Sequence, residues 1–191
     1  MDIQKLIQDL EAVRKVSPLV HNITNLVVMN NTANALLALG ASPVMAHSKN
    51  EVADMAKIAS ALVLNMGTLT NEWVEAMLIA GQTAREHGVP IVFDPVGLGA
   101  TPYRSVAAKQ IIETCKPDII RGNASEIIAL RNDNITTKGV DSTASSESAS
   151  QTAIELAQAT NSVVVVSGET DYITDGNNTY LIKNGDPMME S

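Results

Sequence analysis

Three side chains that suit phosphate chemistry follow predicted strands of this sequence. Asp94 ends one apolar run, Arg121 ends another, and Glu126 falls in the first turn of a helix that Asn123 is expected to cap. Carboxylates could hold Mg²⁺ through water molecules while an arginine neutralises phosphate charge, and phosphoryl transfer depends mainly on such positioning and electrostatics. Phosphoryl transfer is therefore a candidate chemistry on the residues alone.

Two of these residues also have a structural interpretation. Glu126 stands three residues after Asn123, which is the spacing of a capping box, so the sequence leaves a structural and a metal-binding role equally open. Asp94 before Pro95 could simply close a turn, but the segment 94–99 is unusually rich in glycine for a plain connection, which favours a functional role.

Several familiar signatures are absent from the sequence. It has no P-loop motif, no Gly-x-Gly-x-x-Gly after the first predicted strand and no Gly-x-Ser-x-Gly. His21, His47 and His87 do not have zinc-ligand spacing, and His21 and His47 are interpreted as structural. These absences disfavour a P-loop kinase, a simple dinucleotide-binding domain, an α/β-hydrolase and a zinc enzyme.

The elements that must position these residues alternate along the chain. Alternating apolar strands and helices predict a mainly parallel sheet with helices on both faces. Strands are predicted at 18–20, 43–45, 61–64, 90–93, 118–120 and 163–166. Helices are predicted at 3–13, 25–39, 50–60, 70–87, 101–115, 124–131 and 148–160, the first of them amphipathic and packed. An Asp-Gly step at 175–176 predicts an antiparallel edge hairpin, and 132–150 is predicted to be a long surface connection.

Polar and glycine-rich clusters follow nearly every predicted strand. Because ligands bind beyond the carboxyl ends of strands in an open parallel sheet, these clusters predict a site along one rim. The clusters are 21–25, 45–47, 65–68, 94–99, 121–126 and 167–169. The 33 residues between Lys15 and Lys49 contain no Asp, Glu, Lys or Arg, yet they include five asparagines and two histidines. Such a stretch is typical of a polar cavity lining and not of a membrane span.

The composition predicts one soluble domain, 1–191. The 191 residues are 45% hydrophobic and 18% charged, and 13 Lys and Arg against 21 Asp and Glu give a net charge of −8. An acidic chain without a basic run is not expected to bind nucleic acid or an anionic membrane. The single cysteine, Cys115, is predicted to be a buried apolar residue, and the N-terminus lacks a signal-peptide pattern, so a cytoplasmic location is expected. Trp73 is interpreted as a packing residue.

The sequence resembles the hydroxyethylthiazole kinase family of the ribokinase-like superfamily over nearly its whole length. Five blocks in the same order carry the resemblance: 18–25, 32–45, 65–69, 93–101 and 121–126. The resemblance implies a ribokinase-like layered α/β fold. It also implies Mg²⁺- and ATP-dependent phosphorylation of the hydroxyethyl group of 4-methyl-5-(2-hydroxyethyl)thiazole, in thiamine biosynthesis or salvage.

The same resemblance implies roles for eight residues and an assembly. Met45, Asn25 and Gly67 would line the thiazole pocket. Arg121, Ser167 and Asn123 would bind ATP, and Asp94 and Glu126 would serve the Mg²⁺-phosphate region. A homotrimer with thiazole sites between subunits is also implied.

One expected departure concerns the end of the sequence. The family's Val-Thr-Gly-x-Gly-Cys turn, which holds the γ-phosphate and carries a reactive cysteine, would begin just beyond Ser191. No catalytic residue is therefore expected within this chain, at most trace activity is expected, and the hairpin and strand 163–166 are expected to expose apolar surface. The alternatives are another ribokinase-like enzyme, such as a hydroxymethylpyrimidine kinase or an NAD(P)H-hydrate dehydratase, or a non-catalytic nucleotide- or thiazole-binding module.

Overall fold

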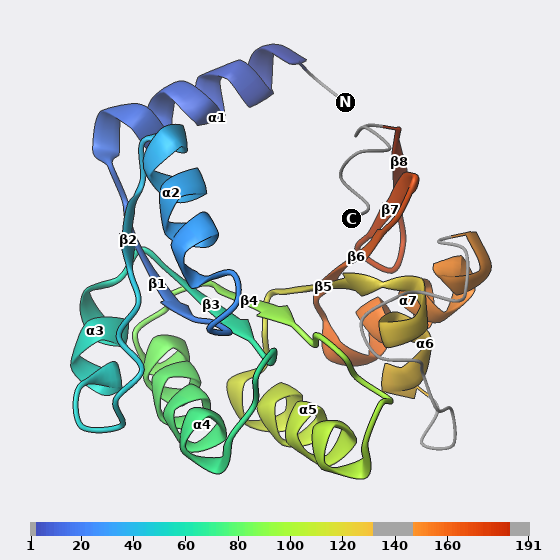
Figure 1. The fold of residues 1–191 in the computed structure, drawn as a ribbon. Coiled ribbons are helices and arrows are strands. Elements are labelled where there is room, and N and C mark those ends of the chain that lie inside the picture. Colours follow the sequence, from blue (N-terminus) through green and yellow to red (C-terminus); the bar gives the residue numbers. More distant parts are fainter. Residues whose placement is uncertain (1–2, 132–146, 184–191) are drawn as a thin grey trace. The chain divides into compact units, whose positions relative to one another are not determined.

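The computed structural model describes residues 3–131 and 147–183, in which helices and strands alternate as predicted (Figure 1). The chain divides into two compact units, Met1–Ile91 and Val92–Ser191. No helix of the described ranges is long and apolar enough to cross a membrane.

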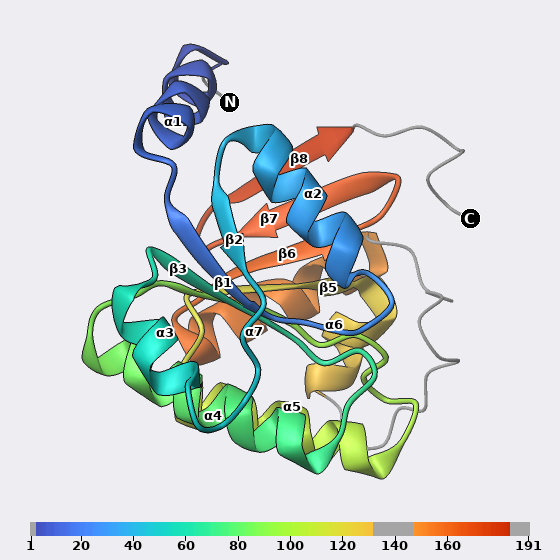
Figure 2. The ribbon, with the colours of Figure 1, turned by 60° about the vertical axis from the view of Figure 1, so that its left-hand side comes forward.

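The first unit is a three-stranded parallel sheet with helices on both faces. Its elements are α1 (Ile3–Val16), β1 (Leu19–Ile23), α2 (Met29–Leu39), β2 (Ser42–Val44), α3 (Val52–Ile58), β3 (Ala61–Asn65) and α4 (Asn71–Glu86). Strand β1 lies in the middle and pairs in parallel with β2 and with β3. The path steps from β1 to β2 and then back past β1 to β3. Since both crossovers are right-handed, α2 covers one face and α3 and α4 cover the other (Figure 2).

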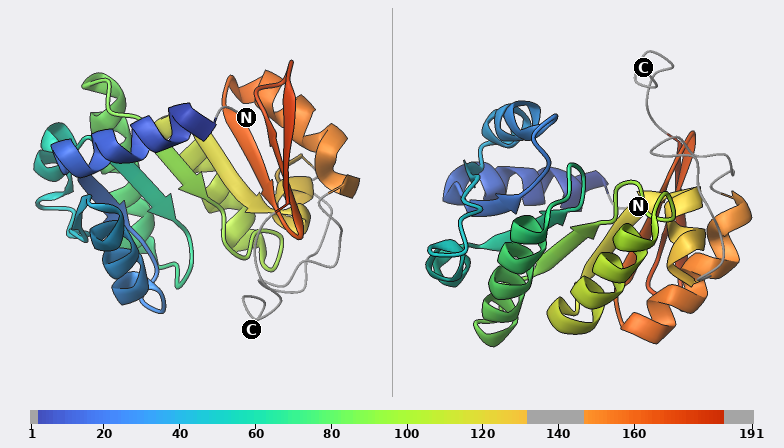
Figure 3. Two further views of the ribbon diagram at one scale, coloured as in Figure 1. Left: turned by 90° about the horizontal axis from the view of Figure 1, so that it is seen from above. Right: turned by 60° about the horizontal axis from the view of Figure 1, so that its bottom comes forward.

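The second unit is a mixed sheet that begins with β4. Its elements are β4 (Ile91–Asp94), α5 (Pro102–Cys115), β5 (Ile119–Asn123), α6 (Ala124–Arg131), the 3₁₀ turn η1 (Glu147–Ala149), α7 (Ser150–Thr160), β6 (Val163–Ser167), β7 (Thr170–Thr174) and β8 (Thr179–Lys183). The pairs β4–β5 and β5–β6 are parallel, and β6–β7 and β7–β8 are antiparallel. The steps from β4 to β5 to β6 run in one direction, so right-handed crossovers place α5, α6 and α7 on the same face (Figure 3).

Local side-chain chemistry sets where several helices begin and end. The hydroxyls of Thr70 and Thr101 each accept the N–H three residues on, and so cap α4 and α5. Gly40 ends α2 in the left-handed conformation, at φ +98°. Helix α2 begins at Met29, four residues later than predicted, because the turn that follows Asn25 is held by that residue's side chain.

Each unit has its own apolar core. In the first unit, strand residues such as Leu62 and Leu64 and the α4 residue Met77 are fully buried. In the second, Phe93 and Cys115 are fully buried, and burial raises the pKa of the Cys115 thiol to about 12. The prediction that Cys115 is a buried apolar residue is confirmed.

The first helix is confirmed, but its predicted packing is wrong. Helix α1 has no buried residue, and Ile3, Leu6 and Ile7 are 65%, 48% and 46% exposed. Periodicity predicts that a helix has an apolar face, but it cannot say whether that face finds a partner within the same chain.

The hairpin prediction is confirmed. Strands β7 and β8 are antiparallel, and Asp175 Oδ1 accepts the N–H groups of Asn177 and Asn178 in the connecting turn. Tyr180 and Leu181 on β8 are exposed, as expected. The expected exposure of strand 163–166 is wrong, because Val164 and Val166 are fully buried and Val163 and Val165 are half-buried between neighbouring elements. Of the predicted connection 132–150, residues 132–146 lie outside the described residues, as do 184–191.

Candidate active site

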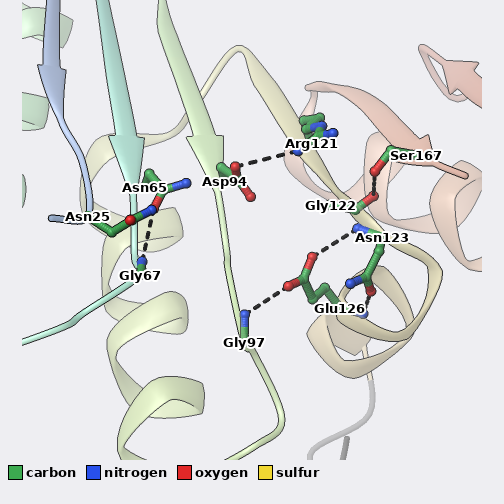
Figure 4. A network of polar contacts seen from close by, with 10 residues as sticks. All are labelled: Asn25, Asn65, Gly67, Asp94, Gly97, Arg121, Gly122, Asn123, Glu126 and Ser167. Carbon is green, nitrogen blue, oxygen red and sulfur yellow. Dashed lines mark hydrogen bonds and ion pairs between the residues drawn. The ribbon is translucent and has the colours of Figure 1, made fainter. Parts of the chain in front are cut away.

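An asparagine pair and a glycine make close contact at the carboxyl ends of β1 and β3 (Figure 4). Asn25 follows β1 and Asn65 ends β3, and the Asn25 Nδ2 group donates to Asn65 Oδ1 at 2.9 Å. The Gly67 N–H donates to the same oxygen at 3.0 Å. Both asparagines are buried, so the amide groups are held by one another instead of by water.

The other end of the Asn25 side chain organises the backbone. Its Oδ1 atom accepts the N–H groups of Val27 and Val28, each at 3.0 Å. Both oxygen and nitrogen of this amide are therefore engaged, which fixes its orientation. Asn25 does not cap α2 itself, whose N-cap residue is Val28; its side chain holds the turn that precedes the helix.

Gly67 is required by its distance from Asn25. A Cβ atom on residue 67 would lie 2.5 Å from Asn25 Cβ, which is closer than non-bonded carbon atoms come. The structure thus brings together two of the three residues predicted for the alcohol-substrate side, and adds Asn65. The sequence places Asn65 in the cluster 65–68 but assigns it no role, because its contact with Asn25 joins residues 40 positions apart in sequence.

Met45 lies at the carboxyl end of β2, the strand beside β1. Its side chain is half-buried, and its carbonyl accepts the His47 Nδ1–H at 3.0 Å. The Asn25–Asn65–Gly67 contacts do not include Met45. Met45 directly follows β2, which pairs with β1 in the same unit.

The Glu126 carboxylate accepts a backbone N–H group on each of its two oxygens. Its Oε1 accepts the Gly97 N–H at 2.8 Å, and its Oε2 accepts the Asn123 N–H at 2.9 Å. In return Asn123 Oδ1 accepts the Glu126 N–H at 3.0 Å, which completes the predicted capping box. Burial raises the pKa of Glu126, outweighing these N–H groups and the nearby Arg121, and the charge of Asp94 adds to the rise.

Asp94 and Arg121 form an ion pair across two neighbouring strands. Asp94 Oδ2 lies 3.7 Å from Arg121 Nη1, because the register that pairs Phe93 with Ile120 sets the next residues side by side. The Asp94 side chain is 18% exposed and the Arg121 side chain 53%. The guanidinium therefore has free solvent-facing surface with which to meet an anion.

Ser167 ends β6 opposite Asn123 on β5. Its hydroxyl donates to the Gly122 carbonyl at 3.3 Å (Figure 4). The predicted nucleotide-side residues Arg121, Asn123 and Ser167 thus lie at the carboxyl ends of two paired strands of one unit, as expected from the parallel sheet.

The glycine-rich segment after Asp94 is a run of tight turns. The N–H groups of Val96, Leu98 and Ala100 donate to the carbonyls of Asp94, Pro95 and Gly97. Gly97 and Gly99 both have positive φ, at +72° and +84°. Arg104 from the first turn of α5 donates to the Val96 carbonyl at 2.7 Å.

Asp94 and Glu126 are the carboxylates that could serve a metal ion here. In the described ranges, no three His, Cys, Asp or Glu side chains gather as a metal-binding group. Each oxygen of Glu126 already accepts an N–H, so this residue would act through water, whereas Asp94 is partly exposed. This donor set fits a largely hydrated Mg²⁺ bound to phosphate.

The α/β fold described above is shared by solved small-molecule kinases. The fold matches the pyridoxal kinase of Staphylococcus aureus with a TM-score of 0.64 at 15% identity, over 86% of this chain and 71% of that one. It matches a hydroxyethylthiazole kinase protein from Pyrococcus horikoshii OT3 with a TM-score of 0.87 at 42% identity, over 97% of this chain and 69% of that one.

Residues 10–191 match the model of the hydroxyethylthiazole kinase family. The chain is 52% identical to a hydroxyethylthiazole kinase of Nitratidesulfovibrio vulgaris, over 95% of this chain and 68% of that protein. It is also 52% identical to one from Leptospira biflexa, over 98% and 70%. The chain belongs to the hydroxyethylthiazole kinase family, which confirms the resemblance seen in the sequence.

Proposed function

We propose that this chain acts in phosphorylation of the hydroxyethyl group of 4-methyl-5-(2-hydroxyethyl)thiazole, with ATP as phosphoryl donor. The expectation of at most trace turnover by residues 1–191 stays a prediction, which ADP formation tests. The observation that carries the proposal is its 52% identity, over nearly the whole chain, to proteins named hydroxyethylthiazole kinase. We further propose that residues 1–191 belong to one kinase domain, which the match to a single solved relative over 97% of the chain supports.

The alcohol-substrate side is assigned to the first unit, through Met45, Asn25 and Gly67. A neutral heteroaromatic alcohol suits the 33-residue stretch without ionisable Asp, Glu, Lys or Arg side chains, because it brings no charge to be balanced. A methionine thioether is a polarisable contact for an aromatic ring. Asn65 and the N–H groups around it fix the amide of Asn25, which supports a pre-formed polar wall.

The nucleotide side is assigned to the second unit, through Arg121, Asn123 and Ser167. The exposed guanidinium of Arg121 suits a phosphate oxygen, and Asp94 keeps it oriented. Mg²⁺, when bound, would neutralise phosphate charge; Asp94 would contact it and Glu126 would act through water.

We also propose a homotrimer that works in the cytoplasm and supplies the thiazole part of thiamine. Exposed apolar side chains of the first unit, among them Leu26, Val27 and Leu37, support an association surface. A molar mass in solution near three times 20.2 kDa is expected from light scattering. A mass equal to one chain would contradict the trimer.

The test of the proposed function is ADP formation that depends on the thiazole alcohol, together with calorimetric titration of each ligand. Met45→Asp should abolish thiazole binding and leave nucleotide binding largely intact, because a buried charge is incompatible with an apolar ring. Met45→Leu is the matched control and should keep both. Preferred turnover of a hydroxymethylpyrimidine would contradict the substrate assignment, and binding of both ligands without ADP would favour the non-catalytic alternative.

A further inference from the structure

Trp73 contacts two of the segments that carry the proposed alcohol-substrate residues. It is the single tryptophan of the chain and the third residue of α4, where it is half-buried. Helical spacing predicts only packing for it. Its indole ring also makes a hydrogen bond and a ring-stacking contact.

The indole N–H holds the segment of Asn25. Trp73 Nε1 donates to the Thr24 carbonyl at 3.1 Å, and Thr24 is a buried residue that directly precedes Asn25. A hydrogen bond from a rigid side chain on a helix therefore fixes the backbone next to the Asn25 amide.

The face of the same ring holds the segment of Met45. The ring of His47 stacks on Trp73 with centroids 4.2 Å apart and planes at 25°. His47 Nδ1 donates in turn to the Met45 carbonyl at 3.0 Å. The chain of contacts runs from α4 through two rings to the backbone of Met45.

Other contacts tie the same three segments together. The buried His21 on β1 donates from Nε2 to the Ala46 carbonyl at 2.7 Å, and the Leu26 N–H donates to Thr68 Oγ1 at 3.1 Å. The carbonyls of Met45 and Ala46 are thus both held by imidazole N–H groups. The segments after β1, β2 and β3 have few ladder hydrogen bonds of their own, so their relative placement depends on such side chains.

We infer that Trp73 is a positioning residue for the alcohol substrate: it sets Met45 and Asn25 at the distance that the thiazole ring requires. The inference rests on the proposed function. Small misplacement of substrate-positioning groups has large effects on binding and rate, so Trp73 should determine the KM for the alcohol while leaving the KM for ATP unaffected.

Two variants of Trp73 and one control test this. Trp73→Leu removes the stack and the N–H, and is expected to raise the KM and Kd for the thiazole alcohol about tenfold, with the KM for ATP changed less than about twofold. Trp73→Phe keeps an aromatic face without the N–H and should fall between Trp73→Leu and the unaltered chain. Glu75→Gln is the control, since it lies on the same helix and removes only an exposed ion pair to Lys49.

His47→Leu keeps the test decisive if Trp73→Leu fails to fold, because His47 is exposed and its removal breaks the stack from the other side. It should also raise the alcohol KM severalfold. In the unaltered chain, addition of the alcohol should change the emission of Trp73, which is its single tryptophan.

The possible outcomes separate the two proposals. Folded Trp73 and His47 variants with unchanged alcohol affinity would overturn this inference alone. An unaltered chain that neither binds nor turns over the thiazole alcohol would overturn the proposed function, and this inference with it. A rise in the alcohol KM matched by an equal rise for ATP would show a general structural role and would also overturn the inference.

Discussion

The Glu126 carboxylate accepts the backbone N–H of Gly97 at 2.8 Å, across 29 positions of sequence. With its other oxygen on the Asn123 N–H, this side chain joins the glycine-rich segment after β4 to the first turn of α6. From the sequence, Glu126 could be either a helix-capping residue or a metal ligand. The structure shows that it links two segments of the second unit. Its proposed metal role would be additional.

Replacement of Glu126 by alanine should lower the free energy of unfolding by about 2–5 kcal/mol, because two buried N–H groups lose their acceptor and α6 loses its cap. Urea unfolding followed by circular dichroism measures this. Glu113→Ala, on the exposed side of α5, is the control and should stay within about 0.5 kcal/mol. A Glu126→Ala variant as stable as the control would show that the two N–H groups find water.

Gly67→Ala should weaken thiazole binding and lower stability by about 1–3 kcal/mol, since the new Cβ forces Asn25 to move. Gly88→Ala is a useful contrast. Residue 88 has φ +69° but nothing within 4 Å of an added Cβ, so it should lose stability from backbone strain alone, about 1–2 kcal/mol. Calorimetry with the thiazole alcohol distinguishes the two; equal binding by both variants would remove Gly67 from the pocket.

Arg121→Ala should weaken ATP binding about ten- to a hundredfold, as expected for loss of one charge-assisted phosphate contact. Because its ion pair with Asp94 is half exposed, stability should change by no more than about 1 kcal/mol. Arg131→Ala removes a similarly exposed pair with Glu155 and serves as the control. Nucleotide titration and thermal unfolding of both variants measure these effects. A change in stability without a change in ATP affinity would show that Arg121 has only a structural role.

Protonation of His21 should make the folded protein less stable at low pH. Burial lowers the pKa of His21 below 6.5, an effect that its bond to the Ala46 carbonyl and the charge of Glu51 only partly oppose. As pH falls below about 6.5 the unfolded chain binds a proton that the folded chain does not, so the free energy of unfolding falls.

His21→Gln should flatten this slope between about pH 5 and pH 7. Urea unfolding across the pH range measures it, and a slope that the substitution of His21 leaves unchanged would mean that His21 binds its proton equally well in the folded and the unfolded chain.

Cys115 should resist alkylation in the folded protein. The thiol is fully buried and its pKa is raised to about 12, so almost no thiolate exists near neutral pH. Iodoacetamide at pH 8 should modify it only after denaturant is added, which mass spectrometry can follow. Rapid labelling without denaturant would indicate that the end of α5 opens.

Features that depend on neighbours in sequence could be predicted. The Asn123–Glu126 capping box, the turn at Asp175 and the strand positions all follow from residue types a few places apart. The interactions that stabilise these features join residues close together in sequence, so the sequence pattern is sufficient to predict them.

Contacts that depend on the order of the strands in the sheet could not be predicted from the sequence. Asn65 meets Asn25, and Trp73 meets His47, because β1 lies between β2 and β3 and α4 packs beside them. Alternating strands and helices predict a parallel sheet but not which strands are neighbours. The packing of α1 was predicted wrongly for a similar reason. Helical periodicity shows that the helix has an apolar face, but it does not show which element, if any, covers that face.

The turns after Asp94 have a consequence for how phosphate can be held. Glycine-rich turns at strand ends often form backbone nests that cradle anions with outward N–H groups. In residues 96–98 and at residue 100, those donors are satisfied by carbonyls of the same segment or by Glu126. An incoming anion would have to compete with the Glu126 carboxylate for the Gly97 N–H, so this segment offers phosphate fewer backbone donors than its glycine content suggests, and side chains such as Arg121 gain importance on this rim.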